Sequence, residues 1–393
     1  MKECSTSKTR IRRKKILFIN SHLRVGGCER SLMDLVNHLD YSHYQVDLLL
    51  LERQHDYLEQ INKEVHIIQC PIENSFGSFG HVIARSIKKR DWFSLRFRLI
   101  NSIAARTHSS FISHARQLLT GLEKQYDLVV AYRPGICSDL AAFAIKANKR
   151  ITWWHHGEFF DFGHIELSYK MMDYIVAVSD SSADIVRSHY PQFKDKVRII
   201  PNMVCKEELL QESEKYAPPA SNGLSIVTVG RMSHEKNIPL CIQIARVLTD
   251  RNIKYTWNII GDGEEYDTVW TAIKESKLEN RVILHGAVSN PYPYMKTADI
   301  LVHPSRVESQ GLTILEAIAL STPVVLVKSN GPMEYIEDRK TGFLVNEDPE
   351  EIADVIEDIY NGTVDGVVIA KNAIQVLQAF DPSNIVHKFE ELI

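Results

Sequence analysis

The chain has 393 residues, of which 44% are hydrophobic and 24% charged, a globular composition in a chain too long for one ordinary core. We expect neither a membrane-spanning helix, which needs about 20 apolar residues, nor a signal peptide, since the apolar segment 16–19 is too short. The net charge of −4 is unevenly divided: residues 206–393 carry 17 Lys and Arg against 29 Asp and Glu, which leaves residues 1–205 basic. A basic half predicts contact with an anionic surface, either nucleic acid or membrane lipid.

An alternation of strands and helices fills the first half of the chain after a basic tail at 1–14. Apolar runs predict buried strands, and a helical pattern at 28–39 separates the first two of them. The predicted strands are 14–20, 44–51, 126–132, 150–156 and 173–179. They indicate a doubly wound domain with a parallel sheet over residues 15–200.

The pattern restarts after a polar stretch at 201–223, which contains Pro218-Pro219 and Asn222-Gly223 and is therefore predicted to be a linker. A helix is predicted at 237–251, and strands are predicted at 224–231, 255–263, 281–286, 298–305 and 322–327. The fold class is therefore α/β, with a second Rossmann-like domain at 224–376 facing the first across a cleft. Residues 377–393 are expected to form a helix that packs back on the first domain.

Two stretches offer groups for a phosphate where strands end. Gly26 and Gly27 let backbone N–H groups approach a ligand closely, although a tight turn explains the pair equally well because the full G-x-G-x-x-G is missing. Arg231 and Lys236 follow a strand and open a helix. They would grip a diphosphate, and the alternative is an ordinary pair of solvated surface charges.

The stretch "ESQGLTILEAIAL" presents a carboxylate on each side of a predicted helix start. One interpretation is local: Thr313 and Glu316 fit the T-x-x-E capping box, which leaves Glu308 as a loop carboxylate. The other is that the N–H groups of Gly311, Leu312 and Thr313 hold a phosphate, with Glu308 and Glu316 on either side of it. Such a layout suits a diphosphate with a sugar at each end, because carboxylates accept hydrogen bonds from sugar hydroxyls.

Two histidines end the aromatic strand "WWHHGE". Strand neighbours alternate in direction, so His155 and His156 are not expected to face one cleft together. No third ligand stands at metal spacing, and the six cysteines are scattered without a C-x-x-C pair. The sequence therefore predicts reduced cytosolic thiols and no metal site.

The sequence resembles the retaining glycosyltransferases of family 4. Glu308 and Glu316 form the E-x7-E pattern of such enzymes, and other fragments follow in the family's order and spacing over nearly the whole chain, most weakly over 52–125. The fragments are "GGCERSLMDL", "AVSDSSADIV", "IIPNMV", "GRMSHEKN", "IIGDGEEY", "LHGAVSN", "ADILVHPSRVESQGLTILEAIALSTPVV" and "NGPMEYIEDRKTGFLV".

The resemblance implies a GT-B fold that binds a UDP- or GDP-linked sugar without a cofactor or metal. By analogy, Arg231 and Lys236 would neutralise the departing diphosphate, and the amides near Leu312 and Thr313 would bind phosphate. Glu316 would bind the ribose and Glu308 the donor sugar, while the Gly26-Gly27 loop would close over the donor. His156 matches the family's active-site histidine best, with His155 as the alternative. Ser309-Gln310 replaces the family's Gly-Phe or Ser-Phe, which leaves the sugar contacts there undefined.

The implied function is retaining transfer of a hexosyl group to a glycan or lipid-linked acceptor, in bacterial cell-envelope, capsule or exopolysaccharide synthesis. A GT-B sugar-nucleotide epimerase and a non-catalytic module for anionic surfaces are the alternatives. The basic segment 81–120, with interleaved apolar residues, predicts peripheral attachment to the anionic inner face of the cell membrane and a cytoplasmic location, with no nucleic-acid partner. Its basic residues are Arg85, Lys88, Lys89, Arg90, Arg96, Arg98, Arg106 and Arg116.

Overall fold

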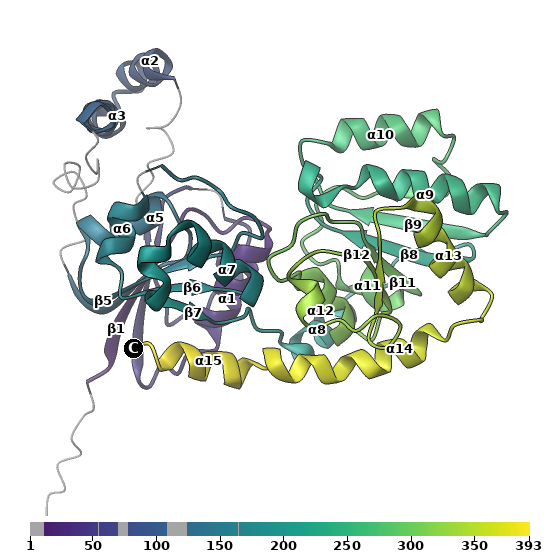
Figure 1. The fold of residues 1–393 in the computed structure, drawn as a ribbon. Helices are drawn as coiled ribbons and strands as arrows, with labels where there is room; N and C mark the ends of the chain where they lie inside the picture. The colour runs from purple at the N-terminus through teal and green to yellow at the C-terminus, as the bar shows by residue number, and fades with distance from the viewer. Residues whose placement is uncertain (1–11, 54, 70–77, 108–123, 164) are drawn as a thin grey trace, which may run out of the picture.

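The computed structural model describes residues 12–53, 55–69, 78–107, 124–163 and 165–393 (Figure 1). Residues 1–11 of the predicted basic tail therefore lie outside the described part of the chain, as do Cys4, Cys70 and Arg116. Among the described residues, no helix is long and apolar enough to cross a bilayer.

The first domain is a seven-stranded parallel sheet in the order β3-β2-β1-β4-β5-β6-β7. Strand β1 lies inside the sheet, and its apolar residues Ile16 to Ile19 are fully buried, which explains its unbroken apolar sequence. The strands are β1 Lys14–Asn20, β2 Tyr44–Leu50, β3 His66–Gln69, β4 Gln125–Ala131, β5 Lys146–Trp154, β6 Tyr174–Ala177 and β7 Val197–Ile199. The helices are α1 Gly27–Asn37, α2 Phe79–Lys89, α3 Trp92–Thr107, α5 Ile136–Asp139, α6 Ile165–Met171 and α7 Asp180–His189.

The second domain is a six-stranded parallel sheet in the order β10-β9-β8-β11-β12-β13. Its strands are β8 Leu224–Val229, β9 Tyr255–Ile260, β10 Val282–Leu284, β11 Ile300–His303, β12 Val324–Val327 and β13 Phe343–Val345. Its helices are α9 Pro239–Asp250, α10 Tyr266–Glu275, α11 Tyr292–Thr297, α12 Leu312–Ala319, α13 Pro349–Tyr360 and α14 Gly366–Ala373. Two doubly wound domains confirm the predicted GT-B fold.

The chain crosses between the domains twice, and the two crossings touch. The amide of Val204 donates to the carbonyl of Phe380 over 2.9 Å. After the first crossing, helix α8 (Lys206–Ser213) lies within the stretch predicted as a linker and packs on α11 and α12. After the second, helix α15 (Pro382–Glu390) returns to the first domain (Figure 1), where Ile385 and Phe389 join the apolar core.

The facing edges of the two domains are in contact. The carboxylate of Glu334 accepts hydrogen bonds from the amides of Asp180 and Ser181, at 3.0 and 2.7 Å, so the second domain caps the start of α7 in the first. A side chain on Gly157 would place its Cβ 2.5 Å from the carbonyl carbon of Glu308. The absence of a side chain at Gly157 is therefore a condition for this closed arrangement.

We predict that Gly157→Ala holds the domains apart, because the Cβ would meet backbone atoms that cannot rotate away. Small-angle scattering should show a larger radius of gyration at an almost unchanged melting temperature. Gly80→Ala is the matched control, since a Cβ there meets nothing within 4 Å. An unchanged radius of gyration in Gly157→Ala would contradict the closed arrangement.

Candidate active site

A buried carboxylate held by a lysine and a histidine lies at the carboxyl end of β11. Glu308 is 7% exposed, and its Oε1 lies 2.5 Å from Lys236 Nζ and 2.6 Å from His303 Nε2. Burial by itself raises the pKa of Glu308, but Lys236 and His303 outweigh burial and leave the pKa below its ordinary value. Glu308 is therefore a fixed, ionised acceptor of hydrogen bonds.

Strand ends bring these three groups together. His303 is the last residue of β11, and Glu308 follows five residues later in the loop before α12. Lys236 ends a single 3-10 turn, His234–Lys236, in the loop between the neighbouring strand β8 and helix α9. Parallel strands end at one edge of a sheet, which explains why residues 72 positions apart meet there.

Arg231 has a different environment from Lys236. It lies two residues after the end of β8, its side chain is 69% exposed, and its carboxylate partner is Glu235 at 3.6 Å. A partner this distant and exposed binds weakly, so the guanidinium can still take an anion bidentately. Of the two predicted cations, Arg231 can therefore bind a phosphate, whereas Lys236 primarily holds Glu308.

Helix α12 begins at Leu312, with Thr313 as its second residue, and no side chain caps its N-terminus. Gly311 stands before it with φ of 78°, a left-handed conformation that glycine adopts without strain. The capping-box interpretation is wrong, because Thr313 lies inside the helix and Glu316 bonds elsewhere. The helix start therefore keeps amide groups and a positive dipole end for an anion.

Glu316 lies one turn further along α12 and faces the first domain. It accepts a hydrogen bond of 2.9 Å from the hydroxyl of Tyr292, and the guanidinium of Arg30 in α1 sits 5.8 Å from the Tyr292 ring centre. Burial raises the pKa of Glu316, and the charge of Arg30 and the Tyr292 hydrogen bond offset this only in part. Glu308 and Glu316 thus have distinct partners on the two sides of the helix start.

The loop with Gly26 and Gly27 lies against this helix start from the first domain. Gly27 begins α1, and a Cβ on it would lie 3.6 Å from Leu312 Cδ1. A Cβ on Gly26 would lie 2.5 Å from the carboxylate oxygen of Glu29. The backbone at Gly26 is extended, a conformation open to any residue, so a side chain there would have to displace the Glu29 carboxylate and would not strain the backbone.

The two histidines after β5 point in different directions. The ring of His155 packs against Tyr132 in the first domain, at 4.8 Å between centres. The ring of His156 stacks on Phe160, and burial, followed by the charges of Arg133 and Arg231, lowers its pKa to about 4. The next residue, Gly157, approaches the backbone of Glu308, so His156 stands beside the contact between the domains, and its lowered pKa keeps it neutral at physiological pH.

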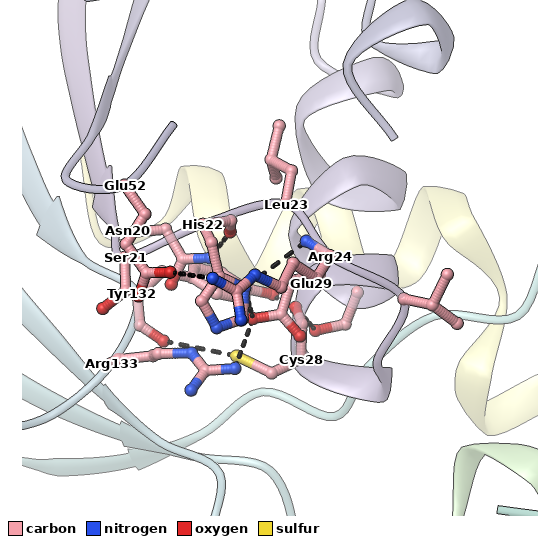
Figure 2. Close-up of polar contacts among 12 residues, drawn as sticks. Asn20, Ser21, His22, Leu23, Arg24, Cys28, Glu29, Glu52, Tyr132 and Arg133 are labelled. Atoms are coloured by element: carbon pink, nitrogen blue, oxygen red, sulfur yellow. Dashed lines mark hydrogen bonds and ion pairs between the residues drawn. The ribbon is translucent and has the colours of Figure 1, made fainter. Parts of the chain in front are cut away.

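A polar cluster that the sequence did not reveal lies at the carboxyl ends of β1 and β4. Figure 2 shows the buried carboxylate of Glu29 between Arg133, whose Nη2 donates to it, and His22, whose Nδ1 lies 3.4 Å away. Arg24 forms a separate ion pair with Glu52 at 2.6 Å. This cluster gives the first domain fixed hydrogen-bonding groups beside the glycine loop.

Other residues at the site were also missed, and each had only a faint signal. His303 stands at a predicted strand end, five residues before Glu308. Arg30 and Tyr292 lie in different domains, and no local pattern links them. Gln310, expected near the sugar, instead exchanges two hydrogen bonds with the backbone of Asn202, at 2.7 and 3.0 Å. It therefore holds the loop to the segment between the domains.

Two family models match the chain, one on each domain. The model described as Glycosyltransferase Family 4 matches residues 25–208, and the model described as Glycosyl transferases group 1 matches residues 211–376. Their boundary falls within the crossing segment where α8 lies.

Individual relatives are distant. An uncharacterized glycosyltransferase of Methanocaldococcus jannaschii is 27% identical over 43% of this chain, and the aligned part spans only 43% of that relative. The N-acetylgalactosamine-N,N'-diacetylbacillosaminyl-diphospho-undecaprenol 4-alpha-N-acetylgalactosaminyltransferase of Campylobacter jejuni is 25% identical over 85% of this chain and 86% of its own. The crystal structure of Anabaena HepE in complex with UDP and glucose superposes with a TM-score of 0.69, covering 96% of this chain and 99% of HepE at 20% identity.

We predict that Lys236 contributes to stability and Arg231 does not. Lys236→Met would leave Glu308 buried without its ammonium partner, which costs about 3–5 kcal/mol of unfolding free energy. Arg231→Gln should change that free energy by less than about 0.5 kcal/mol, because the side chain is exposed. Urea unfolding measures both.

The double variant Lys236→Met/Glu308→Gln is the control, and it should be more stable than Lys236→Met because no charge is left unpaired. Equal losses in Lys236→Met and Arg231→Gln would contradict the different environments of the two cations.

Proposed function

Because the chain is built from the two domains of a GT-B glycosyltransferase, we propose that it transfers a sugar from a nucleoside-diphosphate sugar to a glycan or lipid-linked acceptor. The observation that carries the proposal is the juxtaposition at the end of β11. An ionised Glu308 and the uncapped start of α12 lie on one loop, and the exposed Arg231 follows the neighbouring strand β8. A sugar diphosphate needs these three groups: an acceptor for hydroxyls, amides for phosphate and a cation for charge.

The roles follow from the contacts. Arg231 and the amides of Leu312 and Thr313 stabilise the leaving diphosphate by preorganised electrostatics, with Lys236 as a second cation that also fixes Glu308. Glu308 orients the donor sugar, and Glu316 accepts from the ribose hydroxyls. His156, neutral near Arg231, faces the sugar from the first domain. These protein cations would balance the leaving charge, so the proposed reaction is independent of a metal.

We further propose that the configuration of the donor sugar is retained. Glu308 is engaged by Lys236 and His303 through the same oxygen, which makes it a poor covalent nucleophile. Retention would then follow a front-face route, in which the leaving phosphate takes the acceptor's proton. Anomeric proton signals of donor and product, compared by NMR, test this directly.

The substrates are inferred from the neighbours. HepE was crystallised with UDP and glucose, which supports a UDP-linked donor over a GDP-linked one for this chain. The Campylobacter jejuni relative is named for a diphospho-undecaprenol-linked acceptor, which supports a lipid-linked acceptor and a role in cell-envelope glycan synthesis.

The test is release of nucleoside diphosphate and formation of a glycoside over a panel of UDP- and GDP-sugars. Arg231→Gln should lower kcat by about 10²–10³-fold, the usual effect of removing one donor to developing charge, while the protein stays folded. Release of diphosphate without a glycosidic product would favour the epimerase alternative. Full activity of Arg231→Gln would contradict the proposed site.

We also propose that α2 and α3 rest on an anionic membrane. In this pair of helices, which stands at one end of the first domain (Figure 1), Phe97 packs into the core but Ile87 and Trp92 are 56% and 61% exposed. Lys88 and Lys89 are exposed beside them. Exposed apolar side chains can insert into the headgroup layer, and the basic side chains beside them attract anionic lipids. An enzyme bound there would reach a lipid-linked acceptor.

Charge reversal tests the membrane contact. Lys88→Glu/Lys89→Glu should weaken sedimentation with anionic vesicles at least about tenfold, since each cation near the surface contributes about 1 kcal/mol. Lys254→Glu/Lys371→Glu makes the same change of charge on exposed residues of the second domain and should leave binding intact. Binding that ignores lipid charge and salt, or equal losses in both variants, would contradict the proposal.

A further inference from the structure

Three potential metal ligands gather where the chain first crosses between the domains. His38 stands at the end of α1 in the first domain, whereas Cys205 and Glu208 stand at the start of α8. Their ligand atoms all lie within 4.8 Å of one another, and no other set of three among the described residues does so. We call these three residues the hinge cluster. None of them belongs to the proposed sugar-transfer site.

The hydrogen bonding of His38 directs one ring nitrogen at the other two residues of the cluster. Its Nδ1 lies 2.8 Å from the carbonyl oxygen of Asp34, and a carbonyl only accepts, so Nδ1 carries the proton. In the neutral ring, Nε2 then presents a lone pair to Glu208 Oε1, 3.5 Å away, which is also an acceptor. Nε2 also lies 3.6 Å from Cys205 Sγ, so in the absence of an ion the thiol proton can be donated to it, and an ion would take the place of that proton. A carbonyl on the far nitrogen is also how metal-binding histidines are usually oriented.

The two distances from His38 Nε2 fit one tetrahedral ion, and the third pair of ligand atoms lies within 4.8 Å. Cys205 Sγ lies 3.6 Å from His38 Nε2. A zinc ion with bonds of about 2.3 Å to sulfur and about 2.0 Å to nitrogen at a tetrahedral angle separates those atoms by about 3.5 Å. The same geometry separates nitrogen and carboxylate oxygen by about 3.4 Å, close to the observed 3.5 Å. A set of thiolate, imidazole and carboxylate suits Zn²⁺ better than Mg²⁺ or Ca²⁺, which prefer oxygen.

The surroundings allow an ion to enter and keep its ligands oriented. Cys205 is buried at 5% exposure, but the side chain of Glu208 is 51% exposed and opens the cluster to solvent. The second carboxylate oxygen of Glu208 lies 3.8 Å from the guanidinium of Arg30, which leaves Oε1 directed at His38. Metal ligation requires the thiolate, so a bound ion would displace the Cys205 thiol proton to solvent.

We propose that the hinge cluster binds one Zn²⁺ through Cys205 Sγ, His38 Nε2 and Glu208 Oε1, with water as the fourth ligand. The ion would tie the end of α1 to the start of α8, beside the contact between Val204 and Phe380 where the two crossings meet. It is a structural site at the pivot between the domains, and it fixes their relative position without touching the substrate.

Metal titration of the full chain tests the proposal. Zn²⁺ should bind at one ion per chain in a competition assay with a chromophoric chelator, and Co²⁺ should give a thiolate-to-metal absorption band. Cys205→Ser should abolish that band. His38→Gln and Glu208→Gln should weaken Zn²⁺ binding by more than the about 10–100-fold that loss of an outer partner causes. Zn²⁺ should raise the melting temperature of the unmodified chain by more than that of these three variants.

Cys241→Ser is the matched control, because Cys241 is a buried thiol in the core of the second domain and contacts Thr228. It should keep the Co²⁺ band and the Zn²⁺ affinity. His38→Gln and Glu208→Gln alter partly exposed side chains, so they remain informative if Cys205→Ser does not fold. Absence of the Co²⁺ band in the unmodified chain, or equal affinity in all variants, would overturn the proposal and leave a thiol–imidazole contact only.

Discussion

The ion pair between Glu308 and Lys236 is the constraint on which the site depends. A carboxylate with 7% exposure is stable inside a protein only when cations and hydrogen bonds surround it. Lys236 and His303 meet this need, and both reach Glu308 because β8 and β11 are neighbours whose ends lie at one edge of the sheet. The loop after Glu308 is packed too tightly for side chains at Gly157 and Gly331, each of which approaches its backbone closely. The burial of the Glu308 carboxylate, the packing of its loop and the approach of the first domain therefore depend on one another.

Residues with similar side chains have different environments in this site. The ammonium group of Lys236 is paired with Glu308, whereas the guanidinium of Arg231 is exposed and can bind an anion. Lys236 and His303 hold the pKa of Glu308 below its ordinary value, whereas burial raises the pKa of Glu316 beside Tyr292. The uncapped start of α12 lies between the two carboxylates. Backbone amides that can bind a phosphate are therefore flanked by carboxylates that can accept hydrogen bonds from sugar hydroxyls.

Patterns within a few residues predicted much of this structure. Continuous apolar runs located the interior strands of both sheets, and the positions of Arg231, Lys236 and Glu308 at strand ends were readable because parallel strands end at one edge. The same local view left a capping box at Thr313 and Glu316 open, because the T-x-x-E pattern does not reveal that α12 begins one residue before Thr313. His38 and Cys205 are 167 positions apart, and the Arg30–Tyr292 contact joins two domains. Such pairs arise from the fold and have no signature in the order of residues.

The central claim is that Arg231 and the start of α12 grip a diphosphate. Calorimetric titration with UDP and with uridine, in the unmodified chain and in Arg231→Gln, measures this most directly. The account predicts that the unmodified chain binds UDP more tightly than uridine and that Arg231→Gln loses most of that preference while its uridine affinity is unchanged. Equal preference for UDP in both proteins would contradict it.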